Sequence, residues 1–302
     1  MDRKTSPSQI LARAITKAAS KQTYFTILFF VDRQRVADAY RAYGYFRWAD
    51  DILDAEAGTK SNKLAFANRQ LSLLEACYRG ETPSGLCSEE WMLADLIRND
   101  TEKNSGLQTY LRNMMDVMIF DARRRGRVIT QAELSEYSCM LAKAVTEAMY
   151  FFIGHDDPAP LQEVRYLAVT AAHITHMLRD TLEDTQAGYF NIPREFIQAN
   201  RISPLDIGSR AYREWVCTRV QLARRYFEIG QACLAQIKSL RCRMAGYAYT
   251  ARFEWILSAI EHDNYCLRPE YPERKGPWAG LQMGWSTLAS FFLSPLHKSR
   301  IS

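Results

Sequence analysis

The sequence has little glycine and little proline, 14 and 10 residues in a chain of 302. Tight turns depend on these two residue types, so their scarcity argues against a β-sandwich and favours long helices. Long hydrophobic runs are also lacking, and the longest early run, Tyr24 to Val31, is too short to cross a bilayer. The sequence has no phosphate-binding glycine loop, no HExxH zinc motif and no nucleophile elbow, and nothing in it supports an NADPH cofactor.

The cysteines and the net charge indicate the cellular location and the kind of partner. Seven cysteines are scattered without a CxxC pair, which is typical of reduced thiols in an intracellular protein. The first ten residues contain no apolar leader core, so we expect a cytoplasmic location. A net charge of +5 suits an anionic substrate or the inner face of a membrane, but it is too diffuse to indicate a nucleic-acid partner.

Apolar residues recur with helical spacing along almost the whole chain, which predicts an all-α protein with one domain over residues 1–302. Thr130 and Glu133 have the spacing of a capping box, and Gly188 with Pro193 should end a later helix. Asp156 to Pro158 should start that helix. We expect helices at about 8–30 with a break near Ser20, and at 33–55, 60–78, 88–103, 107–125, 131–154, 159–187, 209–238, 240–265 and 278–293.

A first acidic cluster lies in the segment from Tyr40 to Asp54. With about 3.6 residues per turn, one helical stripe would carry Tyr40, Tyr43, Arg47, Asp50 and Asp54. Because Asp50 and Asp54 are four residues apart without a lysine between them, they should repel each other.

A second acidic cluster lies about 130 residues later. His173, His176, Asp180 and Asp184 are spaced so that they should form one row along a helix. Val169 continues the row one turn upstream, so we expect the row to border a buried surface.

A magnesium ion would explain both clusters, because Mg²⁺ prefers carboxylate oxygens and bridges to substrate phosphates. It would help a diphosphate to leave, and nearby aromatic faces would attract a carbocation. The alternative is that each cluster is a solvated acidic face, paired with Arg47 or Arg179. For the two histidines, the alternative to ligation or diphosphate contact is a hydrogen-bonded place in the core.

At these residues the chain resembles the squalene/phytoene synthase family. The segment 47–54 is similar to the first aspartate-rich motif of that family, and 178–184 is similar to the second. Weaker similarities are found at 20–24, at Asp121, at Glu133–Leu134, at Tyr137 and at Ile260–Glu261, so the resemblance covers about residues 12–275.

This resemblance implies an isoprenoid synthase fold with helices around a central apolar cavity. It also implies a Mg²⁺-dependent prenyltransferase that joins two farnesyl or geranylgeranyl diphosphates head to head through a cyclopropylcarbinyl intermediate. The implied metal ligands are Asp50, Asp54, Asp180 and Asp184, with His176 beside them. These four aspartates and Tyr137 would be catalytic. The residues implied to contact the substrate are Ser20, Tyr43, Arg47, Asp51, Asp121, His173 and Arg179.

The chain departs from the family pattern at several positions. His173 and His176 stand where the family usually has a glutamine and a magnesium-binding asparagine, and Tyr189 stands where it has a basic residue. Lys143 and Thr146 replace paired glycines. Two further functions therefore stay open: a class I terpene cyclase acting on a single prenyl diphosphate, and a non-catalytic assembly or lipid-binding relative.

Two other segments carry expectations. Residues 278–293 are rich in aromatic and apolar side chains without a charge, which fits either a helix lying on a membrane surface or one packed on the domain. The basic cluster from Arg123 to Arg127 could screen a diphosphate entrance, but we interpret it as a solvated helix end.

Overall fold

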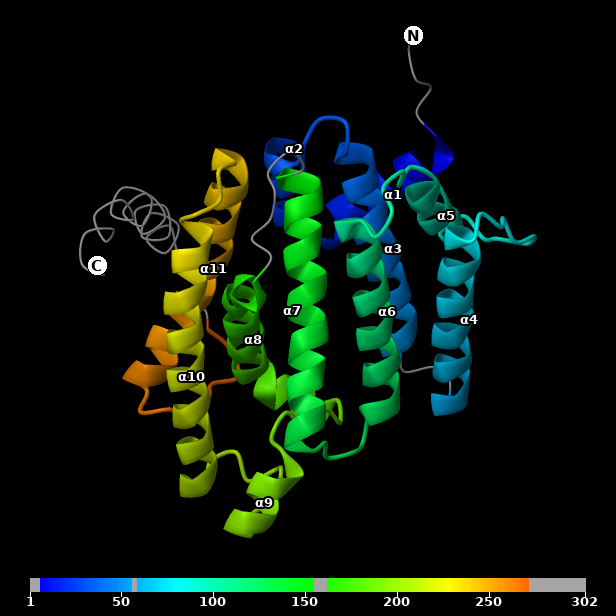
Figure 1. Ribbon diagram of the computed structural model, residues 1–302. Coiled ribbons are helices and arrows are strands. Elements are labelled where there is room, and N and C mark those ends of the chain that lie inside the picture. The colour runs from blue at the N-terminus through cyan, green and yellow to red at the C-terminus, as the bar shows by residue number, and fades with distance from the viewer. Residues whose placement is uncertain (1–5, 56–58, 155–161, 272–302) are drawn as a thin grey trace. The chain divides into compact units, whose positions relative to one another are not determined.

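The computed structural model describes residues 6–55, 59–154 and 162–271. In these ranges it has eleven α-helices and one 3-10 helix, and no strand beyond an isolated parallel bridge between Val128 and Phe190. The predicted all-α fold is confirmed, while the central apolar cavity remains a prediction. The helices (Figure 1) are α1 (Pro7–Ala19), α2 (Lys21–Phe30), α3 (Val36–Asp54), α4 (Lys60–Tyr78), α5 (Glu90–Arg98), α6 (Gly106–Arg124), α7 (Gln131–Ile153), η1 (Glu163–Tyr166), α8 (Leu167–Gln186), α9 (Arg194–Asn200), α10 (Arg210–Leu234) and α11 (Leu240–His262).

Local signals placed several helix ends correctly. The predicted break occurs at Ser20, which ends α1 and starts α2 by accepting a hydrogen bond from the backbone N–H of Thr23 at 3.1 Å. The capping box at the start of α7 is also confirmed. Glu133 N donates to Thr130 Oγ1 at 3.2 Å, and Thr130 N donates to Glu133 Oε2 at 2.8 Å.

Three expectations about helices were wrong. α9 was missed, because seven residues are too short for helical periodicity to be recognised. α5 ends at Arg98 instead of near 103, because its last turn tightens: Asp100 N donates to Ile97 O, three residues back, at 3.0 Å. The regular helix α8 begins at Leu167, after η1, instead of near 159. The predicted helix start at Asp156–Pro158 and the segment 278–293 lie outside the described residues.

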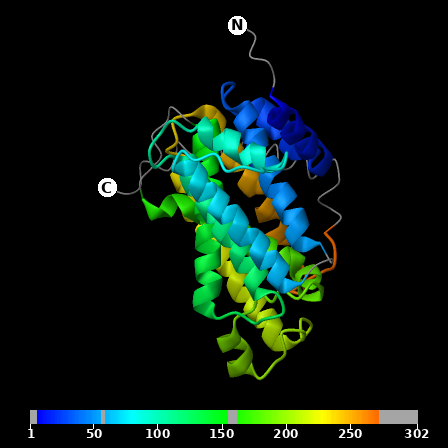
Figure 2. The same ribbon diagram turned by 90° about the vertical axis from the view of Figure 1, so that its right-hand side faces the viewer.

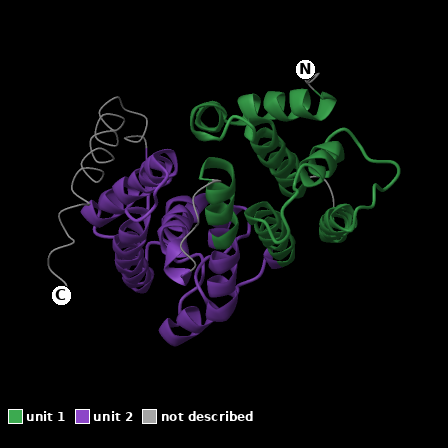
Figure 3. Cartoon of the chain, turned by 45° about the horizontal axis from the view of Figure 1, so that its top comes forward, with its two compact units in different colours: residues 1–123, 143–156 green, residues 124–142, 157–302 purple. Residues whose placement is uncertain are grey.

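The chain divides into two compact units (Figure 3). Unit 1 comprises Met1–Arg123 and Lys143–Asp156, and unit 2 comprises Arg124–Ala142 and Asp157–Ser302. The helix α7 contributes residues to both units. A single domain over residues 1–302 remains a prediction.

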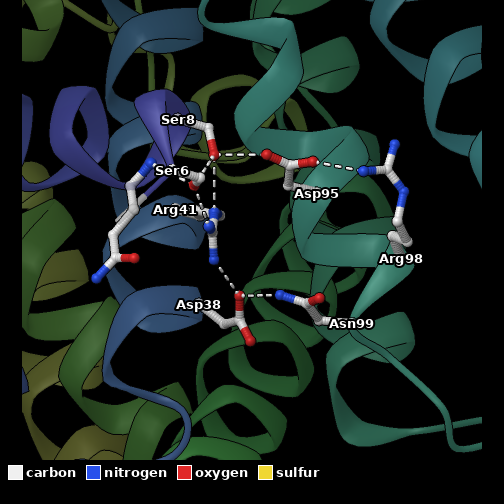
Figure 4. A network of polar contacts seen from close by, with 8 residues as sticks. Ser6, Ser8, Asp38, Arg41, Asp95, Arg98 and Asn99 are labelled. Carbon is white, nitrogen blue, oxygen red and sulfur yellow. Dashed lines mark hydrogen bonds and ion pairs between the residues drawn. The ribbon is translucent and has the colours of Figure 1, made fainter. Parts of the chain in front are cut away.

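A buried arginine joins three helices of unit 1. Arg41 of α3 donates hydrogen bonds to Ser8 Oγ at 3.0 Å and to Ser6 Oγ at 2.7 Å, both at the start of α1 (Figure 4). Ser8 in turn donates to Asp95 Oδ2 of α5 at 2.6 Å, and Arg41 also pairs with Asp38 at 2.7 Å. This network fixes α1 against α3 and α5, which lie beside it in Figure 2. It therefore holds the helix that carries the first acidic cluster.

In unit 2, α8 packs against α10 and α11, which also contact each other. The contact between α8 and α10 is a close approach of two backbones. A Cβ atom added to Gly230 of α10 would lie 2.5 Å from the backbone nitrogen of Ala168, far inside van der Waals contact. Glycine is therefore required at this crossing, which positions the helix that carries the second acidic cluster.

Candidate functional site

The first acidic cluster follows one face of α3 from the core of unit 1 to its surface. Tyr40 is buried, and its hydroxyl donates a hydrogen bond to the backbone oxygen of Tyr24 at 3.1 Å. Further along the helix, the side chains of Arg47 and Asp50 are 43% and 52% exposed. Arg47 forms an ion pair with Asp51 and lies 3.7 Å from Asp50. This pairing with Arg47 is the one expected under the alternative of a solvated acidic face.

Asp50 carries the most perturbed carboxyl group of this cluster. Burial raises the pKa of Asp50 to about 6, the carboxylate of Asp54 adds to this rise, and Arg47 offsets only part of it. Asp51 and, from α6, Asp121 raise the same pKa further, so carboxylates of two helices lie within electrostatic reach of Asp50. Negative charge in this part of unit 1 is thus in excess, which a bound cation would relieve.

The second acidic cluster forms a row on α8, as predicted. Val169, Met177 and His173 along this row are all buried, which confirms that it borders a buried surface. Other members of the row are partly exposed, with 49% exposure at the side chain of His176 and 24% at that of Asp180.

Asp180 is held by two neighbours on its own helix. His176 Nε2 lies 2.9 Å from Asp180 Oδ2, and Arg179 donates two hydrogen bonds to the same carboxylate at 2.5 Å each. Burial acts to raise the pKa of Asp180, but the hydrogen bonds from His176 and Arg179 outweigh burial and hold this pKa well below its usual range. Asp180 is therefore ionised and already partly neutralised.

Asp184 lies at the predicted end of α8. The backbone N–H of Tyr189 bonds to the backbone oxygen of Asp184 at 2.7 Å, and Gly188 adopts a φ of 87° that closes the helix. The side chain of Asp184 accepts a hydrogen bond from Asn191 Nδ2 at 2.7 Å. Burial and the carboxylate of Asp180 raise the pKa of Asp184 to about 6.

Sequence reasoning missed the residues that support Asp184. Arg124, at the end of α6, donates a hydrogen bond from Nη1 to Asn191 Oδ1 at 2.8 Å, so Asn191 links its guanidinium to Asp184. The same guanidinium lies 4.7 Å from the ring centre of Tyr137 and 5.0 Å from that of Tyr189. Arg124 is only 5% exposed, so the interpretation of the basic cluster as a solvated helix end is wrong for this residue.

The chain course explains why Arg124 reaches this position. Gly126 N donates to Gly188 O at 2.8 Å, and the bridge between Val128 and Phe190 continues the contact. The segment after α6 therefore runs beside the segment after α8. Tyr189 stands where the family pattern has a basic residue. Its ring contacts the guanidinium of Arg124, which supplies a positive charge from the end of α6.

His173 is buried next to Tyr137, with ring centres 5.1 Å apart in an edge-on arrangement. Among the described residues, neither ring nitrogen of His173 has a hydrogen-bond partner. Burial, together with the neighbouring His176 and the guanidinium of Arg124, lowers the pKa of His173 to about 3. The imidazole is therefore neutral, and the alternative of a hydrogen-bonded core histidine does not hold for it within the described part of the chain.

The predicted site residues fall into two groups. Those in unit 1 are Ser20, Tyr43, Arg47, Asp50, Asp51, Asp54 and Asp121, and those in unit 2 are Tyr137, His173, His176, Arg179, Asp180 and Asp184. Ser20 has an evident structural role as the cap of α2. Its contact with a substrate remains a prediction.

The carboxylates of the two acidic clusters are oxygen ligands of the kind that Mg²⁺ prefers. No three His, Cys, Asp or Glu side chains in the described ranges converge closely enough to hold a metal by themselves. Mg²⁺ is commonly coordinated by one or two carboxylates, with water and substrate phosphates as its other ligands. Pairs such as Asp50 with Asp54 suit this coordination. The raised pKa values of Asp50 and Asp184 show that each cluster has negative charge left to neutralise.

Comparison with known proteins identifies the family. Residues 16–275 match the family model described as squalene/phytoene synthase. The chain belongs to the squalene/phytoene synthase family. Both acidic clusters of this squalene/phytoene synthase family member lie within the matched residues.

The fold agrees with a solved structure. The chain is similar to the crystal structure of squalene synthase HpnC from Alicyclobacillus acidocaldarius, with a TM-score of 0.67 and 18% sequence identity over 86% of this chain and 95% of that one. No curated protein sequence matches this family member. None of its described helices combines the length and apolar character needed to span a bilayer.

Proposed function

We propose that this protein condenses two prenyl diphosphates head to head in a reaction that depends on Mg²⁺. The observation that carries the proposal is the crowding of carboxylates on two helices. In each cluster one member, Asp50 or Asp184, has a pKa raised to about 6 by burial and by a neighbouring carboxylate. Such excess charge is suited to binding a divalent cation together with a diphosphate.

In this proposal Asp50 and Asp54 hold metal in unit 1, and Asp180 and Asp184 hold it in unit 2. When bound, Mg²⁺ supplies Lewis-acid stabilisation of the charge that develops on the departing diphosphate. Arg47, about one turn upstream on α3, orients Asp51 through their ion pair and lies 3.7 Å from Asp50.

The residues around Tyr137 would serve the hydrocarbon part of the reaction. The faces of aromatic rings attract a carbocation, and His173 next to Tyr137 is neutral. The guanidinium of Arg124 already lies 4.7 Å from the ring centre of Tyr137, so we propose that Tyr137 borders the hydrocarbon without being the main site for its positive charge. Among the described residues the ring nitrogens of His173 have no partner, so the neutral ring is available to accept one hydrogen bond from substrate and to donate one to it. Farnesyl and geranylgeranyl diphosphate are the proposed substrates, and the cytoplasm is the proposed location.

The test is a product analysis. Purified protein is incubated with C10, C15 or C20 prenyl diphosphate, with and without Mg²⁺, and both pyrophosphate release and extracted products are measured. The proposal expects Mg²⁺-dependent release with products of doubled chain length. Cyclic products of unchanged carbon number would instead indicate a terpene cyclase, and no Mg²⁺-dependent release from any of these substrates would defeat the proposal.

One observation favours a second function, that of a non-catalytic assembly or lipid-binding relative. Asp180 already accepts hydrogen bonds from His176 and Arg179, which compete with a metal for its oxygens. This reading expects that Asp50→Ala and Asp180→Ala leave the cellular function intact. Loss of function in both variants would rule it out.

A further inference from the structure

The short helix α2 presents an apolar face to solvent. Phe25, Leu28 and Phe29 are 49%, 43% and 69% exposed. The rings of Phe25 and Phe29 are stacked, with centres 6.1 Å apart. Helical geometry places these three residues and Lys21 on one stripe about 100° wide. Three large apolar side chains are thus gathered on one outward face of unit 1.

The opposite face of α2 is firmly packed. Tyr24 and Ile27 are buried, and the Tyr24 hydroxyl accepts a hydrogen bond from Arg13 Nε of α1 at 2.9 Å. Tyr40 of α3 donates to the backbone oxygen of Tyr24 at 3.1 Å. The orientation of α2 is therefore fixed from within, and its phenylalanines face outward because the other side is already occupied.

The charged residues of α1 and α2 are all basic. Residues 6–31 contain three basic residues, Arg13, Lys17 and Lys21, and no acidic residue. All three are exposed, and the Lys17 ammonium lies 5.8 Å from the ring centre of Tyr24, which places it next to α2. Ile10, which is 59% exposed, shares the Arg13 and Lys17 face of α1 by helical spacing. All charged side chains that α1 and α2 place near the apolar stripe are therefore basic.

We propose that α1 and α2 form a docking surface for an anionic lipid bilayer. Aromatic and leucine side chains enter the boundary between headgroups and acyl chains, while neighbouring lysines and arginines attract anionic headgroups. A stable protein partner would need about 20 residues on each side, whereas this stripe offers only a few side chains, enough for insertion into lipid. The proposal concerns another part of the sequence than residues 278–293, and it does not depend on the proposed catalytic function.

The test is flotation of the full-length protein with vesicles of phosphatidylcholine, with or without phosphatidylserine. We compare the wild type with Phe25→Ser/Phe29→Ser and with Lys17→Glu/Lys21→Glu. Leu205→Ser serves as the matched control, because Leu205 is 63% exposed and lies between α9 and α10, away from this surface in the sequence. Circular dichroism and size-exclusion chromatography establish that each variant is folded and report its oligomeric state.

We expect the wild type to bind the vesicles that contain phosphatidylserine and to be released by salt. Each lysine near the surface is worth about fivefold in binding, so the lysine pair should weaken it by at least tenfold, and the phenylalanine pair by a similar factor. The control should bind within about twofold of the wild type. The proposal is overturned if the wild type does not bind, if both paired variants bind as well as the control, or if the phenylalanine pair acts by converting a dimer to a monomer.

Discussion

His176 Nε2 lies 2.9 Å from Asp180 Oδ2, one helical turn away on α8. With Arg179 on its other side, Asp180 belongs to an ion-pair cluster within its own helix. A metal that uses Asp180 must share it with these neighbours, because one carboxylate has a limited number of free lone pairs. His176 stands where the family pattern has a magnesium-binding asparagine. This replacement should therefore change the affinity of the site for Mg²⁺.

Replacing His176 tests this competition. His176→Asn removes the imidazole and supplies an amide oxygen, a better magnesium ligand. We expect the Mg²⁺ concentration for half-maximal pyrophosphate release to fall by about tenfold. His262→Asn, at an exposed position ending α11, is the matched control and should change nothing. A higher Mg²⁺ requirement in His176→Asn would show that the imidazole assists metal binding.

The charge of Asp50 should lower the stability of the folded protein, although the proposed function needs it for metal binding. The pKa of Asp50 in the folded protein is about 6 against an ordinary value of 3.8, so between these pH values the native state binds more protons than the unfolded state. Stability of the metal-free protein should therefore fall as the pH rises from about 4 to about 6, and stay lower above this range.

Asp50→Asn removes this penalty. Since half of the Asp50 side chain is exposed, solvent screening limits the gain to about 1 kcal/mol, or about 2 °C in melting temperature at pH 7. The same variant should lose Mg²⁺-dependent activity. Glu228→Gln, an exposed change on α10, should alter neither property. A lower melting temperature for Asp50→Asn at pH 7 would contradict the charge argument.

Asn191 should act on the metal through Asp184. Asn191→Ala removes the hydrogen bond at 2.7 Å that orients Asp184 and helps to keep it ionised. We expect about a tenfold higher Mg²⁺ requirement and an acidic limb of the pH–activity profile displaced to higher pH. Asn200→Ala, which removes a bond to a backbone oxygen in α9, is the control. An unchanged pH profile in Asn191→Ala would assign Asn191 a purely structural role.

The crossing of α8 and α10 can be tested by stability alone. Gly230→Ala forces a Cβ atom against the backbone of Ala168 and should destabilise the protein by about 1–3 kcal/mol. Gly208→Ala is matched in chemistry, but its added Cβ meets no atom within 4 Å. Thermal unfolding of the two variants should differ clearly, and equal melting temperatures would mean that the two helices separate freely.

The sequence predicted the parts of the site that depend on local periodicity. Asp180 and Asp184 lie in one row with His173 because offsets of seven and eleven residues return to the same helix face. The start of α7 was predictable because Thr130 and Glu133 form a reciprocal pair within three residues.

The contacts that no local pattern encodes were missed. Arg124 supports Asp184 through Asn191, and Arg124 and Asn191 are 67 positions apart in the sequence. Only the pairing of the chain after α6 with the chain after α8 brings them together. The buried, unpartnered state of His173 likewise depends on packing against Tyr137 from another helix.

The most direct test of the account is pyrophosphate release from farnesyl and geranylgeranyl diphosphate by the wild type, Asp50→Asn and Asp184→Asn across a Mg²⁺ titration. The account predicts Mg²⁺-dependent release by the wild type and a loss of at least a hundredfold in each variant, because removing one carboxylate from either cluster weakens the binding of metal and diphosphate. Release that persists undiminished in both variants, or that never depends on Mg²⁺, would contradict it.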